Sequence, residues 1–311
     1  MQELAQDGLP RLSDVISQLE LRADKALGQN FILDLNLTQR IAGLCGDIAN
    51  RRVVEIGPGP GGLTRALLLK GARHVWTIER DHRCLPALDQ IAKRWPGRLD
   101  IFHGDALIYD WQTAPSISDQ TSLKEINLVN QTDPTAVIIA NLPYGIATKL
   151  LTLWLNVSAW PPWYACMALM FQREVAERIV AYPGTRTYGR LSVLCQWSCK
   201  TQIKLNLPPE VFFPHPKISS AVVVFEPRPE RTPACDPSAL QRVTAAAFGQ
   251  RRKMLRVSLR QLTSQPEVLI KEAGLYGTAR AEEVTVSQYA HLARAFSRLA
   301  HEKKQHHSNV S

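Results

Sequence analysis

The chain has 311 residues, of which 45% are hydrophobic and 21% are charged. This composition allows a sizeable buried core and excludes a largely disordered chain. The formal net charge is +9, which suits a polyanionic partner. The most apolar stretch, Thr152 to Phe171, is interrupted by Asn156, Pro161 and Pro162. We therefore expect no membrane-spanning helix and a cytoplasmic protein.

The cysteines and histidines carry no recognisable metal or disulfide pattern. The six cysteines include no Cys-x-x-Cys pair, so we expect buried, reduced thiols. The eight histidines lack the spacing of zinc ligands, and we expect no metal site.

Short β-branched runs alternate with helical patterns along the chain, which predicts an α/β fold with a parallel sheet. Helices are expected at Leu63–Leu69 and Leu85–Arg94. The expected strands, in chain order, are Arg52–Ile56, His74–Glu79, Leu99–His103, Val137–Ala140, Ala165–Phe171, Ile203–Asn206 and, as a late edge strand, Ser219–Glu226.

Composition also divides the chain into regions. Residues 1–24 form an N-terminal extension, and residues 25–229 form the expected α/β domain. A Pro-rich linker, Pro227 to Pro237, precedes a region with helical periodicity only, residues 236–300. Residues 301–311 are expected to be a disordered tail, and the polar segment Thr113 to Thr135 a surface insertion.

A glycine-rich turn follows the first expected strand, in the segment Glu55 to Thr64. Its glycines, among them Gly57 and Gly59, let the backbone approach a ligand closely. The spacing also satisfies GxGxxG, so a nicotinamide-dependent oxidoreductase stays open as an alternative. Pro58 and Pro60 lack the N–H groups that a pyrophosphate needs. This favours S-adenosylmethionine, which has no phosphate.

Acidic residues stand at the ends of the next two expected strands. Glu79 could accept hydrogen bonds from both ribose hydroxyls of a nucleoside, and Asp105 could accept one from an adenine amine. Either residue alone could instead cap the following helix. Because both stand at successive strand ends, where such sheets bind ligands, we interpret them as cofactor-binding residues.

The fourth strand ends in Asn141-Leu142-Pro143-Tyr144, the most specific motif in the chain. The amide oxygen of Asn141 and the carbonyl of Leu142 could accept the two hydrogens of an adenine N6 amine. This would localise the lone pair of the amine and aim it at a methyl donor. Pro143 stiffens the turn, and Tyr144 offers a stacking face for an extruded base. The alternative is an Asx turn with a core tyrosine.

These residues resemble the KsgA-type small-subunit ribosomal RNA adenine dimethyltransferases, from about Lys25 to about Leu262. The order of the matching segments is more specific than any one of them. The segments are Leu27–Phe31, the glycine turn, Glu79, Gly104–Leu107, Asn141–Tyr144, Gln172–Ala176, Gly189–Val193, Phe213–Lys217 and Arg251–Arg256.

The resemblance implies a Rossmann-like class I methyltransferase domain followed by a small all-helical domain. It implies N6-dimethylation of two adjacent adenosines in a hairpin near the 3′ end of 16S rRNA, during small-subunit maturation. Phe213 resembles a second aromatic wall of the target pocket, with a core aromatic as the equal alternative. The cofactor contacts implied by position are Asn30, Ile32, Gly57, Glu79, Asp105 and Asn141.

A basic run lies in the C-terminal region. Between Gln241 and Arg260 there are six arginines or lysines and no acid. A helix over Gln250–Leu262 would place Arg252, Arg256 and Arg260 on one stripe facing RNA phosphates. Arg251 and Lys253 extend the predicted RNA-binding set.

Two further alternatives stay open. A 23S rRNA adenine methyltransferase of the erythromycin-resistance type would share the cofactor and catalytic motifs, and a non-catalytic ribosome-assembly factor would share the fold. The segments Phe213–Lys217 and Arg251–Arg256 favour the small-subunit enzyme. We expect a monomer that acts on 16S rRNA.

Overall fold

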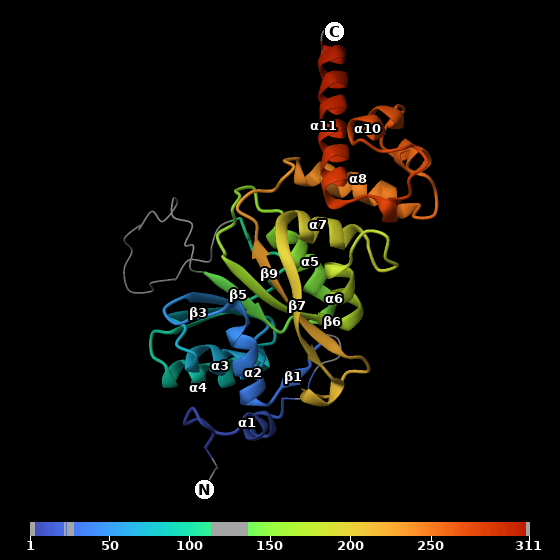
Figure 1. Cartoon of the computed structure of the whole chain (residues 1–311). Coiled ribbons are helices and arrows are strands. Elements are labelled where there is room, and N and C mark those ends of the chain that lie inside the picture. The colour runs from blue at the N-terminus through green and yellow to red at the C-terminus, as the bar shows by residue number, and fades with distance from the viewer. Residues whose placement is uncertain (1–3, 22, 24–27, 113–135, 309–311) are drawn as a thin grey trace. The chain divides into compact units, whose positions relative to one another are not determined.

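The computed structural model describes residues 4–21, 23, 28–112 and 136–308 (Figure 1). The expected insertion at 113–135 therefore lies outside the described residues. By its internal contacts the chain divides into two units. An α/β unit comprises residues 1–176 and 202–226, and a helical unit comprises residues 177–201 and 227–311.

The α/β unit contains a seven-stranded sheet and a two-stranded sheet. The strands are β1 (Phe31–Ile32), β2 (Arg52–Ile56), β3 (His74–Glu79), β4 (Leu99–His103), β5 (Val137–Ala140), β6 (Cys166–Gln172), β7 (Cys199–Leu207), β8 (Phe212–Phe213) and β9 (Ser220–Pro227). The helices are α1 (Leu12–Gln18), α2 (Leu35–Ala42), α3 (Gly62–Leu69), α4 (Leu85–Arg94) and α5 (Tyr144–Leu155), with 3-10 turns η2 (Gly43–Cys45), η3 (His82–Cys84) and η4 (Pro209–Val211). Helix α6 (Arg173–Val180) begins in this unit and ends in the helical unit.

The strands of the large sheet follow the order β4-β3-β2-β5-β6-β9-β7. Neighbouring strands from β4 to β6 are parallel, so the carboxyl ends of β2, β3 and β5 meet at one edge. All residues of β3 and β5 are buried, as expected of parallel strands covered on both faces. The sheet therefore gathers Gly57, Glu79 and Asn141, which follow or end these strands, at the same place.

The expectation that the last strand lies at the edge of the sheet was wrong. β9 is antiparallel to β6 and lies between β6 and β7. Its residues Ala221–Phe225 are all buried, a continuous apolar run that indicates cover on both faces. The alternating burial of β7 identifies that strand as the edge strand.

The helical unit has its own core. Its helices are α7 (Arg190–Ser198), α8 (Pro237–Gly249), α9 (Leu255–Ser258), α10 (Pro266–Glu272) and α11 (Val286–Ser308), with 3-10 turns η5 (Leu259–Gln261) and η6 (Ala281–Glu283). The rings of Tyr188 and Tyr289 both contact that of Phe248, with centroids 5.9 and 5.6 Å from it. The Trp197 indole donates to the carbonyl of Pro233 at 2.9 Å.

Two boundaries differ from the sequence prediction. The helical unit includes residues 177–201, which the sequence prediction placed in the α/β domain. Tyr188, Val193 and Trp197 join its core, and this long-range packing has no local sequence signal. α11 continues to Ser308, so residues 301–308 of the expected tail are helical, and residues 309–311 lie outside the described residues.

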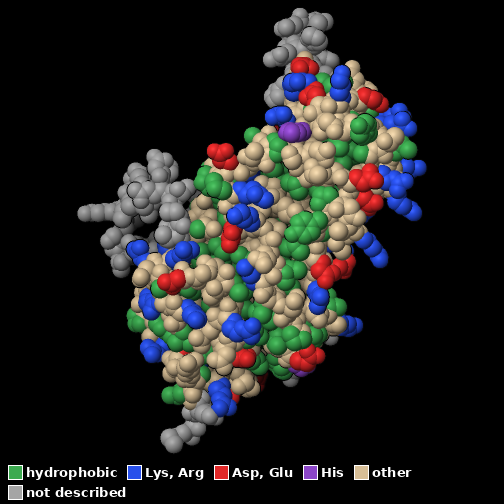
Figure 2. All heavy atoms as spheres, viewed as in Figure 1, with side chains coloured by type: hydrophobic (Ala, Val, Ile, Leu, Met, Phe, Trp, Pro, Cys, Tyr) green, Lys and Arg blue, Asp and Glu red, His purple; other side chains and the backbone are tan. Residues whose placement is uncertain are grey.

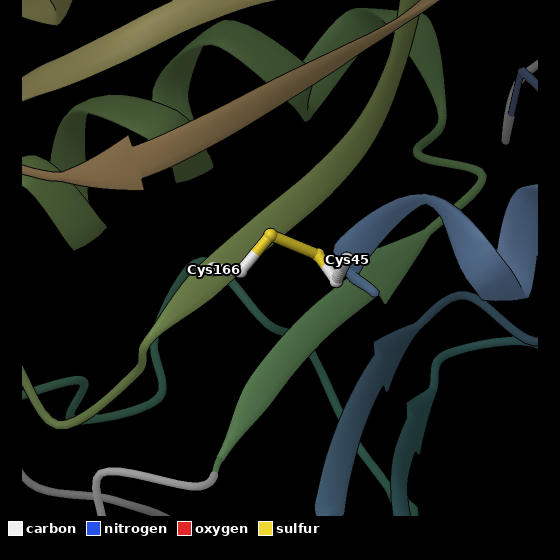
Figure 3. Close-up of a disulfide and its surroundings, with 2 residues drawn as sticks. All are labelled: Cys45 and Cys166. Atoms are coloured by element: carbon white, nitrogen blue, oxygen red, sulfur yellow. A yellow bond between two sulfur atoms is a disulfide. The ribbon is translucent and has the colours of Figure 1, made fainter. Parts of the chain in front are cut away.

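The expectation of reduced thiols was wrong for one pair. Cys45, at the end of η2, and Cys166, at the start of β6, form a disulfide with their Cα atoms 5.9 Å apart (Figure 3). They are 121 residues apart in sequence, so a search for short cysteine motifs could not pair them. The other cysteines, Cys84, Cys195, Cys199 and Cys235, are free.

Within the described part of the chain, no helix combines the length and the apolar character that crossing a membrane requires.

Candidate active site

A cavity of about 280 Å³ opens at the carboxyl ends of β2, β3 and β5. Its lining includes ten of the residues singled out from the sequence, which come from five separate segments of the chain. These are Asn30, Ile32, Gly57, Gly59, Glu79, Asp105, Asn141, Leu142, Pro143 and Tyr144. The structure thus brings the predicted cofactor and catalytic residues together in one cavity.

The glycine turn between β2 and α3 forms one side of this cavity. Gly57 and Gly59 have φ angles of +66° and +56°, in the left-handed region that favours glycine. A Cβ at Gly59 would lie 3.0 Å from the ring of Phe31. The turn therefore needs glycine both for its backbone conformation and for its packing.

Glu79, at the end of β3, is 5% exposed and points its carboxylate at the glycine turn. One oxygen accepts the N–H of Gly59 at 2.8 Å, and the other accepts the N–H of Asp81 at 2.7 Å. Burial raises the pKa of Glu79, and these hydrogen bonds oppose that rise. The carboxylate predicted to bind ribose therefore also holds the glycine turn in place.

Glu55, on β2, is a buried acid beside the turn and accepts the hydroxyl of Thr64 at 2.7 Å. Burial raises the pKa of Glu55 to about 8, and the nearby charge of Glu79 adds to the increase. Glu55 is therefore mainly neutral at pH 7. It lines the cavity as a hydrogen-bonding group rather than as a fixed negative charge.

Asp81 was missed in the sequence, although it stands two residues after Glu79. It accepts a hydrogen bond from Gln29 at 2.8 Å and pairs with Arg83 at 2.7 Å. The Arg83 hydrogen bonds lower the pKa of Asp81 to about 2. Asp81 thereby connects β3 to the segment that carries Asn30, another cavity residue.

Asp105 follows β4 and lines the cavity at its outer side. Its Oδ1 accepts the N–H of Leu107 at 2.9 Å, and its Oδ2 lies 3.5 Å from Arg80. Asp105 therefore makes a local turn and also faces the cavity. The two interpretations drawn from its sequence position are compatible.

The Asn141–Tyr144 motif connects β5 to α5. The side-chain amide of Asn141 donates to the backbone carbonyl of Asn30 at 2.9 Å. This bond fixes the rotamer of Asn141, and with the nitrogen engaged the oxygen is the free acceptor end of the amide. Leu142 is 1% exposed, so its side chain anchors the turn in the core.

Tyr144 begins α5 and lines the cavity. Its hydroxyl lies 2.6 Å from that of Ser220 on β9. Burial raises the pKa of Tyr144, so its hydroxyl stays protonated near neutral pH. The ring is thus held by its tip and still lines the cavity, an arrangement that suits a stacking surface.

Phe213 is half-exposed, so it is not the core aromatic that the sequence left open. Its neighbour Phe212 takes the buried position. On the short β1–β8 sheet, Phe213 lies directly across from Phe31, which packs under the glycine turn. Phe213 itself does not line the cavity among the described residues.

The predicted basic stripe is built differently from the expectation. No continuous helix covers Gln250–Leu262, because residues 250–254 form a turn before α9 and η5. Arg251 is only partly exposed and donates to Glu282 at 2.8 Å and to the carbonyls of Tyr188 and Thr185.

The neighbouring basic residues Arg252, Lys253, Arg256 and Arg260 are exposed. Lysine and arginine side chains gather on the surface of the helical unit in Figure 2. A basic face is therefore present, although it lies on turns and short helices. Among the residues that the structure describes, no cluster of His, Cys, Asp and Glu is arranged to hold a metal ion.

Comparison with known proteins gives a consistent picture. The family model for ribosomal RNA adenine dimethylase matches residues 20–298. The ribosomal RNA small subunit methyltransferase A of Paracoccus denitrificans is 51% identical over 291 residues, covering 94% of this chain and 97% of the relative. Its counterpart in Mesorhizobium japonicum is 52% identical over 289 residues, covering 93% and 99%.

Solved structures share the fold at lower identity. A dimethyladenosine transferase from Plasmodium falciparum has a TM-score of 0.66 at 22% identity, covering 84% of this chain and 96% of the other. The 23S rRNA methyltransferase ErmE has a TM-score of 0.60 at 22% identity, covering 86% and 100%. These likenesses support a Rossmann-like class I methyltransferase fold with a helical C-terminal part. The chain belongs to the ribosomal RNA adenine dimethylase family.

Proposed function

We propose that the protein transfers methyl groups from S-adenosylmethionine to N6 of two adjacent adenosines near the 3′ end of 16S rRNA. The chain shares about half of its residues with small-subunit methyltransferases over nearly its whole length, which supports this substrate. The observation that carries the proposal is that Asn141 and the glycine turn line the same cavity.

The cavity fits S-adenosylmethionine by the chemistry of its lining. Gly57 and Gly59 leave the backbone accessible where side chains would intrude. S-adenosylmethionine has no phosphate, so it does not require the N–H groups that Pro58 and Pro60 lack. Glu79 offers carboxylate oxygens for ribose hydroxyls, and Asp105 offers one for the adenine amine. Asn30, Ile32 and Asn141 complete the proposed contacts. When bound, the cofactor supplies an electrophilic methyl group on its sulfonium.

The residues after β5 would position the target adenine. The oxygen of Asn141 and the carbonyl of Leu142 accept the N6 hydrogens, which directs the amine lone pair toward the methyl donor. Pro143 restricts the turn, and the anchored ring of Tyr144 stacks on the extruded base. Phe213, the half-exposed residue of the β1–β8 sheet, would contact the part of the base that extends beyond the cavity.

The exposed basic residues of the helical unit would hold the RNA backbone. Arg252, Lys253 and Arg256 face solvent and would neutralise phosphates. Arg251 supports this face through its bonds to Glu282 and Tyr188. We further propose that the protein acts as a cytoplasmic monomer without a metal ion.

The test uses radiolabelled S-adenosylmethionine with unmethylated 30S particles, and 50S particles in parallel. We expect N6,N6-dimethyladenosine in 16S rRNA, and a rate about a thousandfold lower for Asn141→Ala, since a positioning acceptor at the reacting atom is lost. Because Asn141 is also a proposed cofactor contact, the rates are compared at S-adenosylmethionine concentrations that saturate each protein, as set by its Kd for S-adenosylhomocysteine. Label in 23S rRNA alone would contradict the substrate, and no label in either particle would indicate a non-catalytic assembly role.

A further inference from the structure

The family match begins at residue 20, yet the chain before it contributes to the active-site cavity. Residues 4–21 are described and include α1. Leu12, the first residue of α1, lines the cavity together with Ile32, Gly59 and Gly62. A segment outside the matched family region therefore forms part of the wall.

Leu12 is fitted closely to the glycine turn. A Cβ at Gly62 would lie 2.9 Å from Cδ2 of Leu12 and 2.6 Å from the carbonyl oxygen of Ile32. Gly62 is the first residue of α3, so α1 packs where the turn enters this helix. A side chain at position 62 would therefore clash both with Leu12 of the N-terminal segment and with Ile32 of β1.

A buried ion pair holds the segment against α3. The carboxylate of Asp7 accepts both Nε and Nη2 of Arg65, the latter at 2.6 Å, and the two side chains are 0% and 4% exposed. Arg65 also donates to the carbonyl of Pro10 at 2.9 Å, and Arg94 donates to that of Asp7 at 3.1 Å. A buried bidentate pair of this kind fixes geometry, since breaking it leaves an unpaired buried charge.

We infer that residues 4–21 form a wall of the cofactor site, with Leu12 in contact with the bound cofactor and Asp7 as a positioning residue. The inference rests on the proposed function, because it assumes that the cavity holds S-adenosylmethionine. It predicts that the segment governs cofactor affinity and has little effect on methyl transfer once the cofactor is bound.

Ile16 provides a matched control for Leu12. Both side chains are on α1, both are 7% exposed, and both pack in the same small cluster with Leu21, Phe31 and Cys84. Among the two, only Leu12 lines the cavity. Truncation of either residue should lower the melting temperature similarly, so a difference in cofactor affinity isolates the wall function.

The experiment measures the Kd of S-adenosylhomocysteine by calorimetry for the full chain and its variants. Leu12→Ala should raise the Kd about fivefold through lost apolar contact, and Ile16→Ala less than about twofold. Leu12→Val replaces the alanine variant should the latter fail to fold. Equal Kd values for the two alanine variants would overturn the inference. Failure of the wild-type chain to bind would overturn the proposed function with it.

Asp7→Asn tests the positioning role. We expect a higher KM for S-adenosylmethionine with kcat changed less than about twofold, since the target-base residues are untouched. Hydrogen exchange of the wild-type chain gives a measurement that needs no variant. Backbone amides of residues 12–18 should gain protection when S-adenosylhomocysteine binds. If exchange in this segment is unchanged at saturating S-adenosylhomocysteine, the segment does not contact the bound ligand and the inference is contradicted.

Discussion

The cavity of the α/β unit and the basic face of the helical unit place charged side chains in opposite surroundings. Glu55 and Glu79 are 1% and 5% exposed and are held by hydrogen bonds from Thr64 and the glycine turn. Arg252 and Arg256 are exposed on a turn and a short helix. Burial raises the pKa of both acids, whereas the two arginines are exposed to solvent and their charges are screened by salt.

This difference separates two kinds of function. The buried acids define a rigid site whose properties depend on a few distances, so substitutions there should produce large, pH-dependent effects. The exposed cations act together over a broad surface, so single substitutions should have small effects that depend on ionic strength. The following variants test this contrast.

The largest effect is expected for Glu55→Gln. The pKa of Glu55 is about 8 in the folded chain, against an ordinary value of 4.5. Between these values the folded chain keeps a proton that the unfolded chain has released, so wild-type stability decreases as pH rises from 5 to 8. The variant should lack this loss, which amounts to at most ~5 kcal/mol.

Thermal unfolding of both proteins between pH 5 and 9 measures this difference. The gap in melting temperature should widen up to about pH 8 and then level off. Glu226→Gln, at an exposed position, is the control. Parallel curves for wild type and Glu55→Gln would mean that Glu55 is ionised in the folded chain.

Tyr144→Ala should have the next largest effect. Loss of the stacking ring should slow methyl transfer about thirtyfold, in line with the energy of base–aromatic stacking. Tyr144→Phe keeps the ring and loses only the bond to Ser220, so its rate should stay within about threefold of wild type. Single-turnover rates at saturating cofactor measure both. Equal losses in the two variants would assign the effect to the hydroxyl.

Arg251→Ala and Arg252→Ala contrast a partly exposed with an exposed arginine. Arg251 and Glu282 are 32% and 35% exposed, so solvent screens their ion pair. Loss of Arg251 should lower stability by about 1–2 kcal/mol, mainly through its bonds to backbone carbonyls. Calorimetric unfolding measures this, and Arg252→Ala should leave the melting temperature unchanged.

The smallest effect is expected for RNA binding by Arg252→Ala. Its affinity for 30S particles should fall severalfold. The slope of log K against log salt concentration should become shallower by about one, as expected for the loss of one phosphate contact. Binding measured from low to physiological salt checks this. A loss of affinity that is independent of salt would argue against a phosphate contact at Arg252.

Local sequence patterns predicted the central part of the α/β unit well. The bounds of β2, β3, β4, β5 and α4 match the expectation, because these segments have continuous apolar or clearly periodic patterns. The strand ends then placed Glu79 and Asn141 at one edge. Parallel topology allows this inference, since it fixes which ends of the strands meet.

Features that depend on contacts between distant residues were missed. Asp7 and Arg65 are 58 residues apart, and no local sequence pattern shows that they form an ion pair. The place of β9 within the sheet, the packing of Trp197 in the helical unit and the bond of Arg251 to a backbone carbonyl are also tertiary outcomes. A charge run such as Arg251–Arg256 indicates a basic surface but cannot show which member is partly buried.

The disulfide between Cys45 and Cys166 gives the α/β unit an unusual connectivity. It closes a covalent ring that includes β2 to β5 and α3 to α5, and with them Gly57, Glu79 and Asn141. A single cut anywhere inside this ring leaves both pieces joined. An oxidised chain nicked once inside this ring would therefore run as one species under denaturing conditions without reductant, and as two fragments once the disulfide is reduced.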